Sequence, residues 1–210
     1  MAATPPPQPR FLLFIAAMFT GLLIISNIVA VKIADFSSVS GPISDFFLPS
    51  AVVAFPLTYI FGDILTEVYG YRRARQVIWS AFAANAVVVL VIVATDELPA
   101  APFYADQEAY HAILGQTWRI VLGSFTAFLV GEFANSMVLS RLKVATQGRW
   151  LWTRTISSTV VGEGLDSAIF ITIAFAGREG FELWPLIWRQ WLFKVGFEVI
   201  ATPVTYVVVD

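Results

Sequence analysis

The chain has 210 residues, 58% of them hydrophobic and 13% charged, with a mean hydropathy of +0.74, whereas an ordinary soluble domain is about 25% charged. Long uncharged stretches place it among membrane proteins, and the formal net charge of −2 says little, because orientation in a bilayer depends on where Lys and Arg fall. The absence of cysteine excludes disulfides, thiol catalysis and Cys-ligated metals, and the single histidine, His111, excludes sites that need two or more histidines.

Residues 1–10, MAATPPPQPR, form a proline-rich polar tail that is too short and irregular to fold. The remainder, 11–210, is predicted to be a single transmembrane domain, because a helix of about 20 residues spans the hydrocarbon core. The first apolar run exceeds the roughly 7–15 apolar residues of a cleaved signal, so we expect a retained helix. The six predicted spans are 11–34, 48–69, 74–95, 118–141, 153–177 and 184–208.

Basic residues are concentrated on one side of this arrangement. The amino-terminal tail and the connections between the second and third and between the fourth and fifth spans carry Arg10, Arg72, Arg73, Arg75, Arg141, Lys143, Arg149 and Arg154. The alternate connections are acidic or mixed, and the positive-inside bias therefore places both termini in the cytoplasm. The sequence predicts an all-α membrane protein with six transmembrane helices and an N-in, C-in topology.

Four of the predicted spans carry a pair of polar side chains on one helix face. Asp63 and Glu67 are four residues apart in the span 48–69, so they share a face. The other pairs are Glu132 with Asn135, Glu163 with Asp166, and Lys194 with Glu198, and the first span contributes Asn27. An ionisable group at the bilayer centre costs about 3 kcal/mol on insertion scales. The arrangement with the lowest insertion cost turns these faces inward, where they line one polar chamber.

Other interpretations of several of these residues stay open. Glu67 lies near the cytoplasmic exit of its helix and could reach the interface beside Arg72, and Lys32 could extend its ammonium to the outer interface. Lys194 and Glu198 could form a structural ion pair. Pro56 and Pro203 each remove a backbone donor within a predicted span, which fits either an ordinary kink or a break that lines a cavity.

A chamber lined by carboxylates and amides favours a particular kind of solute. A carboxylate accepts two parallel hydrogen bonds, so it matches a planar group that presents two adjacent N–H donors, such as the edge of guanine. Aromatic residues on the same helices, including Phe133, Phe170 and Trp191, could stack on a heterocycle or simply pack. The residues favour a donor-rich or cationic solute over a phosphate or a dicarboxylate.

Three sequence blocks resemble the queuosine precursor transporter family, which is also called the vitamin uptake transporter family. They are FPLTYIFGDILTEVYGYRRAR, then GEFANSMVLSRLK with GRWLWTRTISSTVVGEGLDS, and finally KVGFEVIATPVTY. The resemblance extends from Asn27 to Tyr206. It implies a protein of the inner (cytoplasmic) membrane that imports 7-deazaguanine precursors of queuosine, preQ0 or preQ1, and kinship with the substrate-binding membrane components of energy-coupling-factor transporters.

The resemblance also assigns site residues. Those expected to bind substrate are Asn27, Glu132, Asn135, Glu163, Asp166, Lys194 and Glu198, and an inner gate or coupling site is expected at Asp63, Glu67 and Arg154. Their expected depth in the membrane and the helix faces on which they lie favour Glu132 and Glu163 as the carboxylates that bind the base, with Asp166 and Glu198 in support. The expected partners are a purine-like solute, membrane lipid and a second copy of the chain, with no nucleic acid, cofactor or metal.

Two alternatives belong to other classes of protein. The chain could be a binding subunit for another vitamin-like solute that works with a separate ATPase, because it has no G-x-x-x-x-G-K-[ST] phosphate loop of its own. It could also be a membrane-embedded hydrolase that uses paired aspartates. The sequence has neither a Gly-x-Gly-Asp motif nor a G-x-S-x-G elbow, which speaks against the hydrolase.

Overall fold

The computed structural model describes residues 11–38, 45–147, 151–178, 180 and 182–209. The side chains of residues 59, 63, 67, 139, 143, 151–155 and 201–209 lie outside that description. The elements are α1 (Leu12–Val29), β1 (Ile33–Asp35), β2 (Phe47–Pro49), the 3₁₀ helix η1 (Ser50–Val53), α2 (Phe55–Tyr69), α3 (Tyr71–Asp96), α4 (Gln107–Leu114), α5 (Thr117–Ala145), α6 (Leu151–Phe175) and α7 (Leu183–Val209). The expected tail, 1–10, is outside the described residues.

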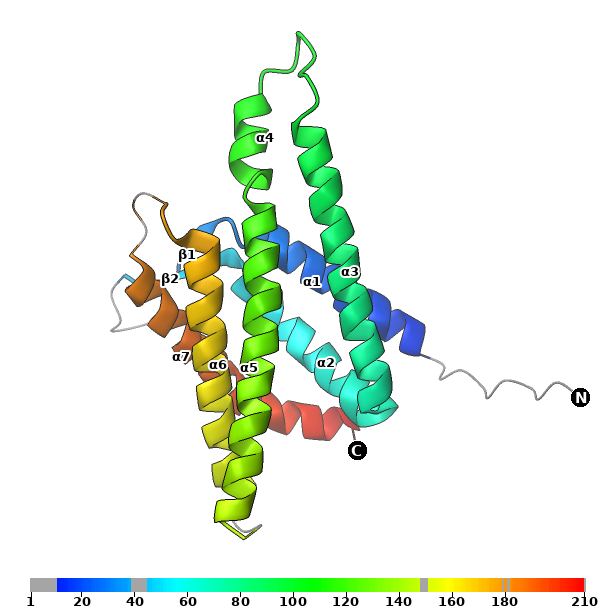
Figure 1. Ribbon diagram of the computed structural model, residues 1–210, viewed down its shortest axis with the longest axis vertical. Coiled ribbons are helices and arrows are strands. Elements are labelled where there is room, and N and C mark those ends of the chain that lie inside the picture. Colours follow the sequence, from blue (N-terminus) through cyan, green and yellow to red (C-terminus); the bar gives the residue numbers. More distant parts are fainter. Residues whose placement is uncertain (1–10, 39–44, 148–150, 179, 181, 210) are drawn as a thin grey trace, which may run out of the picture.

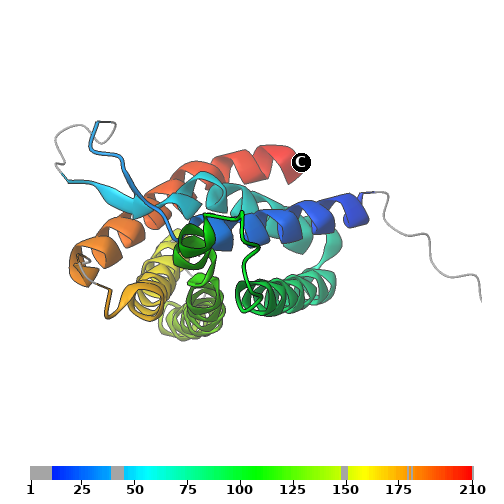
Figure 2. The same cartoon turned by 90° about the horizontal axis from the view of Figure 1, so that it is seen from above.

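The helices form two layers that cross each other. Helices α3, α5 and α6 run along the long axis of the molecule (Figure 1) and are seen nearly end-on in the view from above (Figure 2). Helices α1, α2 and α7 lie across them in the second layer. The antiparallel pair β1 and β2, in which Ala34 faces Leu48, connects α1 to η1.

Helices α5 and α6 approach each other closely because small residues face the contact. A Cβ atom added at Gly162 would lie 2.9 Å from the Asn135 Cβ and 3.0 Å from the Gly131 carbonyl oxygen. One added at Gly131 would lie 3.1 Å from the Asp166 Cβ. Small residues let membrane helices pack with their backbones close together, and here they place Asn135 and Asp166 at the helix contact.

The buried face of α1 explains where a polar site can form. Ile15, Phe19 and Leu23 belong to one apolar cluster, together with residues of α2 and α3, and Ala30, just after α1, belongs to a second cluster with residues of α5, α6 and α7. Between the two clusters the same buried face carries Ser26 and Asn27, which are 2% and 4% exposed. The helical period of 3.6 residues places these positions in one line, so two polar side chains interrupt an apolar seam.

Helix α6 ends against a side chain of α5. The Arg119 guanidinium donates from Nε to the Ile173 carbonyl at 3.2 Å and from Nη2 to the Ala176 carbonyl at 2.7 Å. The last carbonyls of a helix have no partner within that helix, and a basic group also suits the negative end of the helix dipole. Arg119 therefore holds the ends of α5 and α6 together.

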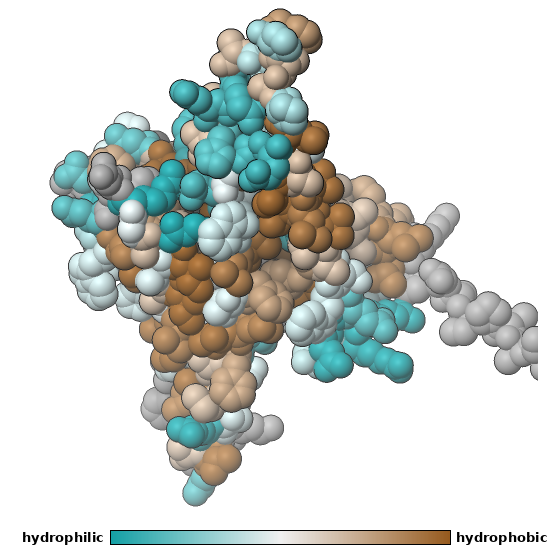
Figure 3. Space-filling view, turned by 45° about the horizontal axis from the view of Figure 1, so that its top comes forward, coloured by the Kyte–Doolittle hydropathy of each residue, from teal (hydrophilic) through white to brown (hydrophobic). Residues whose placement is uncertain are grey.

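Four helical segments are long and apolar enough to cross a membrane, counted over the described residues. They are Leu12–Val29, Tyr71–Asp96, Gln107–Leu142, which joins α4 to α5, and Ile156–Phe175. A broad apolar surface lies between hydrophilic regions in the space-filling view (Figure 3). The exposed large hydrophobic residues of the chain include Leu90 and Trp184. These features indicate a multi-pass membrane protein.

The predicted span 48–69 is not the one continuous helix that the apolar run suggested. It is divided into β2, η1 and α2, and α2 has 15 residues, which gives a length of about 22 Å, short of the roughly 30 Å hydrocarbon core. Pro56 lies in the first turn of α2, where a missing N–H breaks no helical hydrogen bond. Pro203 lies within α7, whose assignment continues to Val209.

Candidate functional site

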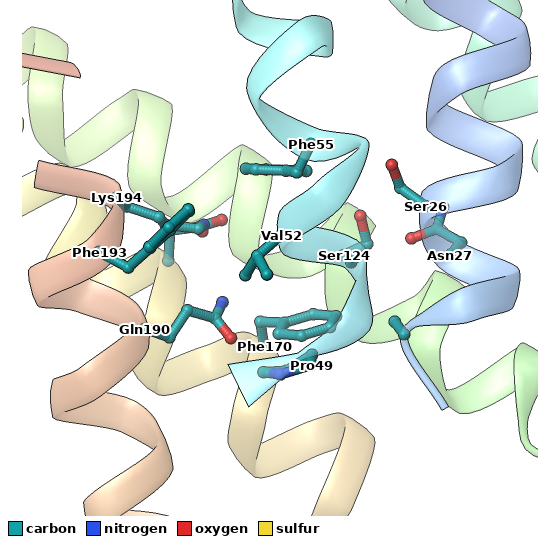
Figure 4. A pocket seen from close by; sticks show the side chains of 13 residues that line it. Ser26, Asn27, Pro49, Val52, Phe55, Ser124, Phe170, Gln190, Phe193 and Lys194 are labelled. Atoms are coloured by element: carbon teal, nitrogen blue, oxygen red, sulfur yellow. The ribbon is translucent and has the colours of Figure 1, made fainter. Parts of the chain in front are cut away.

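A cavity lies where the two layers of helices meet. It is lined by residues of α1, the β2–η1–α2 segment, α5, α6 and α7. Phe55, Phe170 and Phe193 supply aromatic surface, while Asn27, Ser124 and Gln190 supply polar groups (Figure 4). An apolar pocket with a few polar groups is the usual form of a small-molecule site.

The interrupted second span forms one wall of this cavity. Pro49 of β2, Ala51 and Val52 of η1, and Phe55 at the start of α2 all line it. Within a membrane, irregular backbone is tolerated only where it is buried in protein or lines a cavity. Transporters commonly build their solute sites from discontinuous helices of this kind. The break in the predicted second span is therefore explained by its position at the wall of the cavity.

Lys194 of α7 is the central charge of the site. Its side chain is 6% exposed, and its Nζ forms ion pairs with Asp166 and with Glu163 Oε2, the latter at 3.3 Å. The ammonium also lies 4.7 Å from the centre of the Phe55 ring, within cation–π range. A buried charge requires such partners, because its transfer from water costs several kcal/mol. Lys194 thus joins α7 to α6 and to the first turn of α2.

On the opposite side, an amide pair fixes Asn27. The Asn27 Nδ2 donates to the Asn85 Oδ1 at 2.9 Å, and the Asn85 Nδ2 donates to the Ala81 carbonyl at the same distance. Asn85 is 1% exposed. This chain of hydrogen bonds between α1 and α3 holds the Asn27 side chain in one orientation at the edge of the cavity.

Two buried oxygen atoms of cavity-lining residues have no hydrogen-bond partner in the described part of the chain. They are Ser26 Oγ and Gln190 Oε1, and the two residues are 2% and 5% exposed. A buried acceptor or hydroxyl left without a partner costs about 1–3 kcal/mol. Groups of this kind are expected where a ligand or water completes the hydrogen bonding.

Comparison with known proteins identifies the family. Residues 49–208 match the family described as "Putative vitamin uptake transporter". The chain belongs to this family. The family is one of transporters, so the expectation that the chain is not an enzyme is confirmed and the hydrolase alternative is wrong.

Three relatives have names that specify a solute. The chain is 28% identical over 156 residues to a "Probable queuosine precursor transporter" of Bacillus subtilis (strain 168), covering 73% of this chain and 68% of the relative. It is 28% identical to a protein of the same name from Haemophilus influenzae, covering 64% of this chain and 56% of the relative. It is 24% identical to the "Queuosine precursor transporter" of Escherichia coli (strain K12), covering 58% and 52%. No solved structure matches the chain significantly.

Three predicted site residues of this vitamin uptake transporter line the cavity, namely Asn27, Asp166 and Lys194. Glu163 is connected to it through its ion pair with Lys194. The Glu198 Oε1 accepts from the Thr159 hydroxyl at 3.1 Å, and neither of these residues is among those that line the cavity.

The remaining predicted residues lie elsewhere in the transporter. Glu132 is at an exposed position of α5, close enough to Glu163 for the two carboxylates to interact electrostatically. Asn135 packs against Gly162, and its Oδ1 is buried without a partner among the described residues. Neither lines the cavity, so the preference for Glu132 as a base-binding carboxylate gains no support from this geometry. The side chains of Asp63, Glu67 and Arg154 lie outside the described residues.

Sequence reasoning missed Gln190, Ser26 and Phe55. Gln190 is four residues before Lys194 and therefore shares its helix face, a spacing that could have identified it. Ser26 precedes Asn27, but a serine within an apolar helix attracts little notice because it can hydrogen-bond its own backbone. Phe55 is one of 18 phenylalanines, and its ring position over Lys194 depends on the fold.

Proposed function

We propose that this protein imports a queuosine precursor of the 7-deazaguanine type, such as preQ0 or preQ1, across the inner (cytoplasmic) membrane for salvage into tRNA. The observation that carries the proposal is the cavity between the helix layers, where Asp166, Lys194 and Gln190 meet the rings of Phe55, Phe170 and Phe193. It occurs in a chain of the vitamin uptake transporter family whose relatives are named for this solute.

The chemistry of the cavity suits such a base. A 7-deazaguanine has a ring N–H beside an exocyclic amine, and a carboxylate such as that of Asp166 can accept from both. Phe55 and Phe170 lie on different sides of the cavity and offer faces for a planar ring (Figure 4). The aminomethyl group of preQ1 is cationic, so it would compete with the Lys194 ammonium for Asp166 and Glu163.

The proposed topology has six crossings with both termini inside. The four long apolar helices support four crossings, and we propose that η1 with α2, and α7, supply the other two. Arg72, Arg73 and Arg75, near the start of α3, lie on the inner side in this arrangement. Kinship with the substrate-binding membrane components of energy-coupling-factor transporters is proposed because the family resemblance implies it.

A second candidate is a binding subunit that serves another vitamin-like solute together with a separate ATPase. The family description and the missing phosphate loop favour it. Uptake by the purified chain in liposomes separates the candidates, because a subunit that depends on an ATPase would bind its solute without accumulating it. The proposed partners are otherwise a purine-like solute, membrane lipid and a second copy of the chain.

Gene deletion tests the main proposal. In cells that obtain queuosine only by salvage and have no second importer, deletion is expected to remove queuosine from tRNA at trace external preQ0 or preQ1. Re-expression of the wild-type chain should restore it. Normal queuosine in the deletion strain would contradict the proposal.

A further inference from the structure

We propose that Gln190 and Ser26 hydrogen-bond the transported solute from two sides of the cavity, and that they select a planar solute with an N–H donor on one edge and a second polar group on another. The inference rests on the proposed function. It concerns Gln190 of α7 and Ser26 of α1, which do not belong to the polar pairs that the sequence predicts to line the chamber.

The two side chains are buried in the wall of the cavity. Gln190 is 5% exposed and Ser26 is 2% exposed, and both line the cavity. Figure 4 places the Gln190 amide beside Phe170 and Phe193, and the Ser26 hydroxyl on the other side, next to Asn27. The view from above places α2 between α7 and α1, so the two groups approach the cavity from separate helices (Figure 2).

Their missing partners point to a ligand. Several buried side chains in the described ranges have an atom without a hydrogen bond, but among these atoms only Ser26 Oγ and Gln190 Oε1 belong to residues that line this cavity. Two separate helices, α1 and α7, therefore each contribute to the cavity wall a residue with an unpartnered oxygen. Polar groups held this way in an apolar site confer specificity, because a ligand that lacks the matching group leaves them unpaired.

The hydrogen-bonding capacity of the two side chains limits which ligands can bind between them. The Gln190 Oε1 can only accept, and the Ser26 hydroxyl can accept or donate. The complementary ligand therefore needs an N–H on the edge that faces Gln190 and a second polar group on the edge that faces Ser26. A 7-deazaguanine meets this requirement, because its pyrrole N–H and the N–H of its six-membered ring lie on different edges of the ring system. An analogue that is methylated at the pyrrole nitrogen has lost one of the two donors.

The test uses the purified full-length chain in detergent and neutral preQ0 as the probe. Gln190→Met and Ser26→Ala each remove one unpartnered oxygen, and Ser167→Ala is the matched control, because the Ser167 hydroxyl is buried and unpartnered in the described structure but does not line the cavity. The Kd for preQ0 by calorimetry should rise roughly tenfold in Gln190→Met and in Ser26→Ala and stay unchanged in Ser167→Ala. The melting temperature without ligand should stay the same or rise in all three, because each change removes an unsatisfied group.

A second substitution guards against a variant that fails to fold. Gln190→Glu keeps an acceptor oxygen at the same position, so it should bind preQ0 more tightly than Gln190→Met. Wild-type protein should also bind the pyrrole N-methyl analogue at least roughly tenfold more weakly than preQ0. Unchanged Kd values in both Gln190→Met and Ser26→Ala, with wild-type binding intact, would overturn this inference alone. No binding of preQ0, preQ1, queuine or guanine by wild-type protein would overturn the proposed function as well.

Discussion

At the scale of single residues, the charge balance around Lys194 dominates the site. One ammonium is shared by Asp166 and Glu163, and the side chains of both carboxylates are mostly buried, at 17% and 16% exposed. Removing one member of a buried ion pair is costly because it leaves an uncompensated charge. The ammonium therefore stabilises the ligand-free state, and it also occupies the carboxylates that a cationic solute would use.

Replacing Lys194 should reveal this balance. Lys194→Met is expected to lower the free energy of unfolding by about 3 kcal/mol, because Asp166 and Glu163 lose their counter-ion. Asp166→Asn should destabilise the wild-type chain, yet have little effect or be stabilising in the Lys194→Met background. Unfolding of the four proteins of this double-mutant cycle in mixed micelles measures the coupling.

The matched control is Lys32→Met, which removes an exposed lysine just after α1. It should leave the free energy of unfolding nearly unchanged. Equal effects of Asp166→Asn with and without Lys194 would show that the two residues do not interact.

At the scale of secondary-structure elements, the close contact of α5 and α6 gives the cavity a rigid wall. Ser124 comes from α5, whereas Asp166 and Phe170 come from α6. Gly131 and Gly162 permit the close approach. The Trp191 Nε1 then donates to the Val160 carbonyl at 3.0 Å, which fixes α7 on α6 and with it the positions of Gln190 and Lys194.

Gly162→Ala is expected to force α5 and α6 apart. The new Cβ would lie 2.9 Å from the Asn135 Cβ, so the free energy of unfolding should fall by about 2 kcal/mol. Gly21→Ala on α1 is the control, because its Cβ would meet nothing within 4 Å and alanine favours the helix. Thermal melting of both variants provides the measurement. Equal stability of Gly162→Ala and wild type would contradict the close packing.

Much of the element pattern could be predicted from the sequence, for identifiable reasons. The four long apolar helices follow from long, predominantly hydrophobic runs, and Pro56 lies near the place where the second span breaks. The β1–β2 hairpin was missed because its strands have three residues each, too few for a period-two pattern.

The site was only partly predictable. Sequence spacing identifies neighbours on one helix, so it placed Lys194 beside Glu198 and Glu163 beside Asp166. The recorded ion pairs of Lys194 instead reach from α7 to α6, and such a pairing depends on how the helices pack. The same limit explains why Glu132 was preferred over Asp166, although Asp166 is the carboxylate that lines the cavity.

At the scale of the whole molecule, the two ends of α5 should lie on opposite sides of the membrane. The α3–α4 connection is acidic, and it is held by the contact of Asp96 Oδ2 with His111 Nδ1 at 2.5 Å and by the Thr95–Tyr110 hydroxyl contact at 2.8 Å. The other end of α5 carries Arg141. The proposed topology therefore places residues 97–106 outside and Val144 inside.

Single cysteines can test this topology cleanly, because the chain contains none. Phe103 is 92% exposed and Val144 is 80% exposed. In intact spheroplasts a membrane-impermeant maleimide should label Phe103→Cys, and it should label Val144→Cys only after the membrane is opened. Labelling of Val144→Cys alone in intact spheroplasts would show that the orientation is inverted.

The central claim is that a 7-deazaguanine binds in the cavity between the two helix layers, and a structure of the full-length protein saturated with preQ0 tests it most directly. We expect a planar ligand in contact with Asp166, Gln190 and the Phe170 ring, which line that cavity. A ligand bound at another place, with the cavity beside Lys194 empty, would contradict the account. One such place is the second cavity, which is lined by Asp96, Glu97, Gln107, Glu108 and His111.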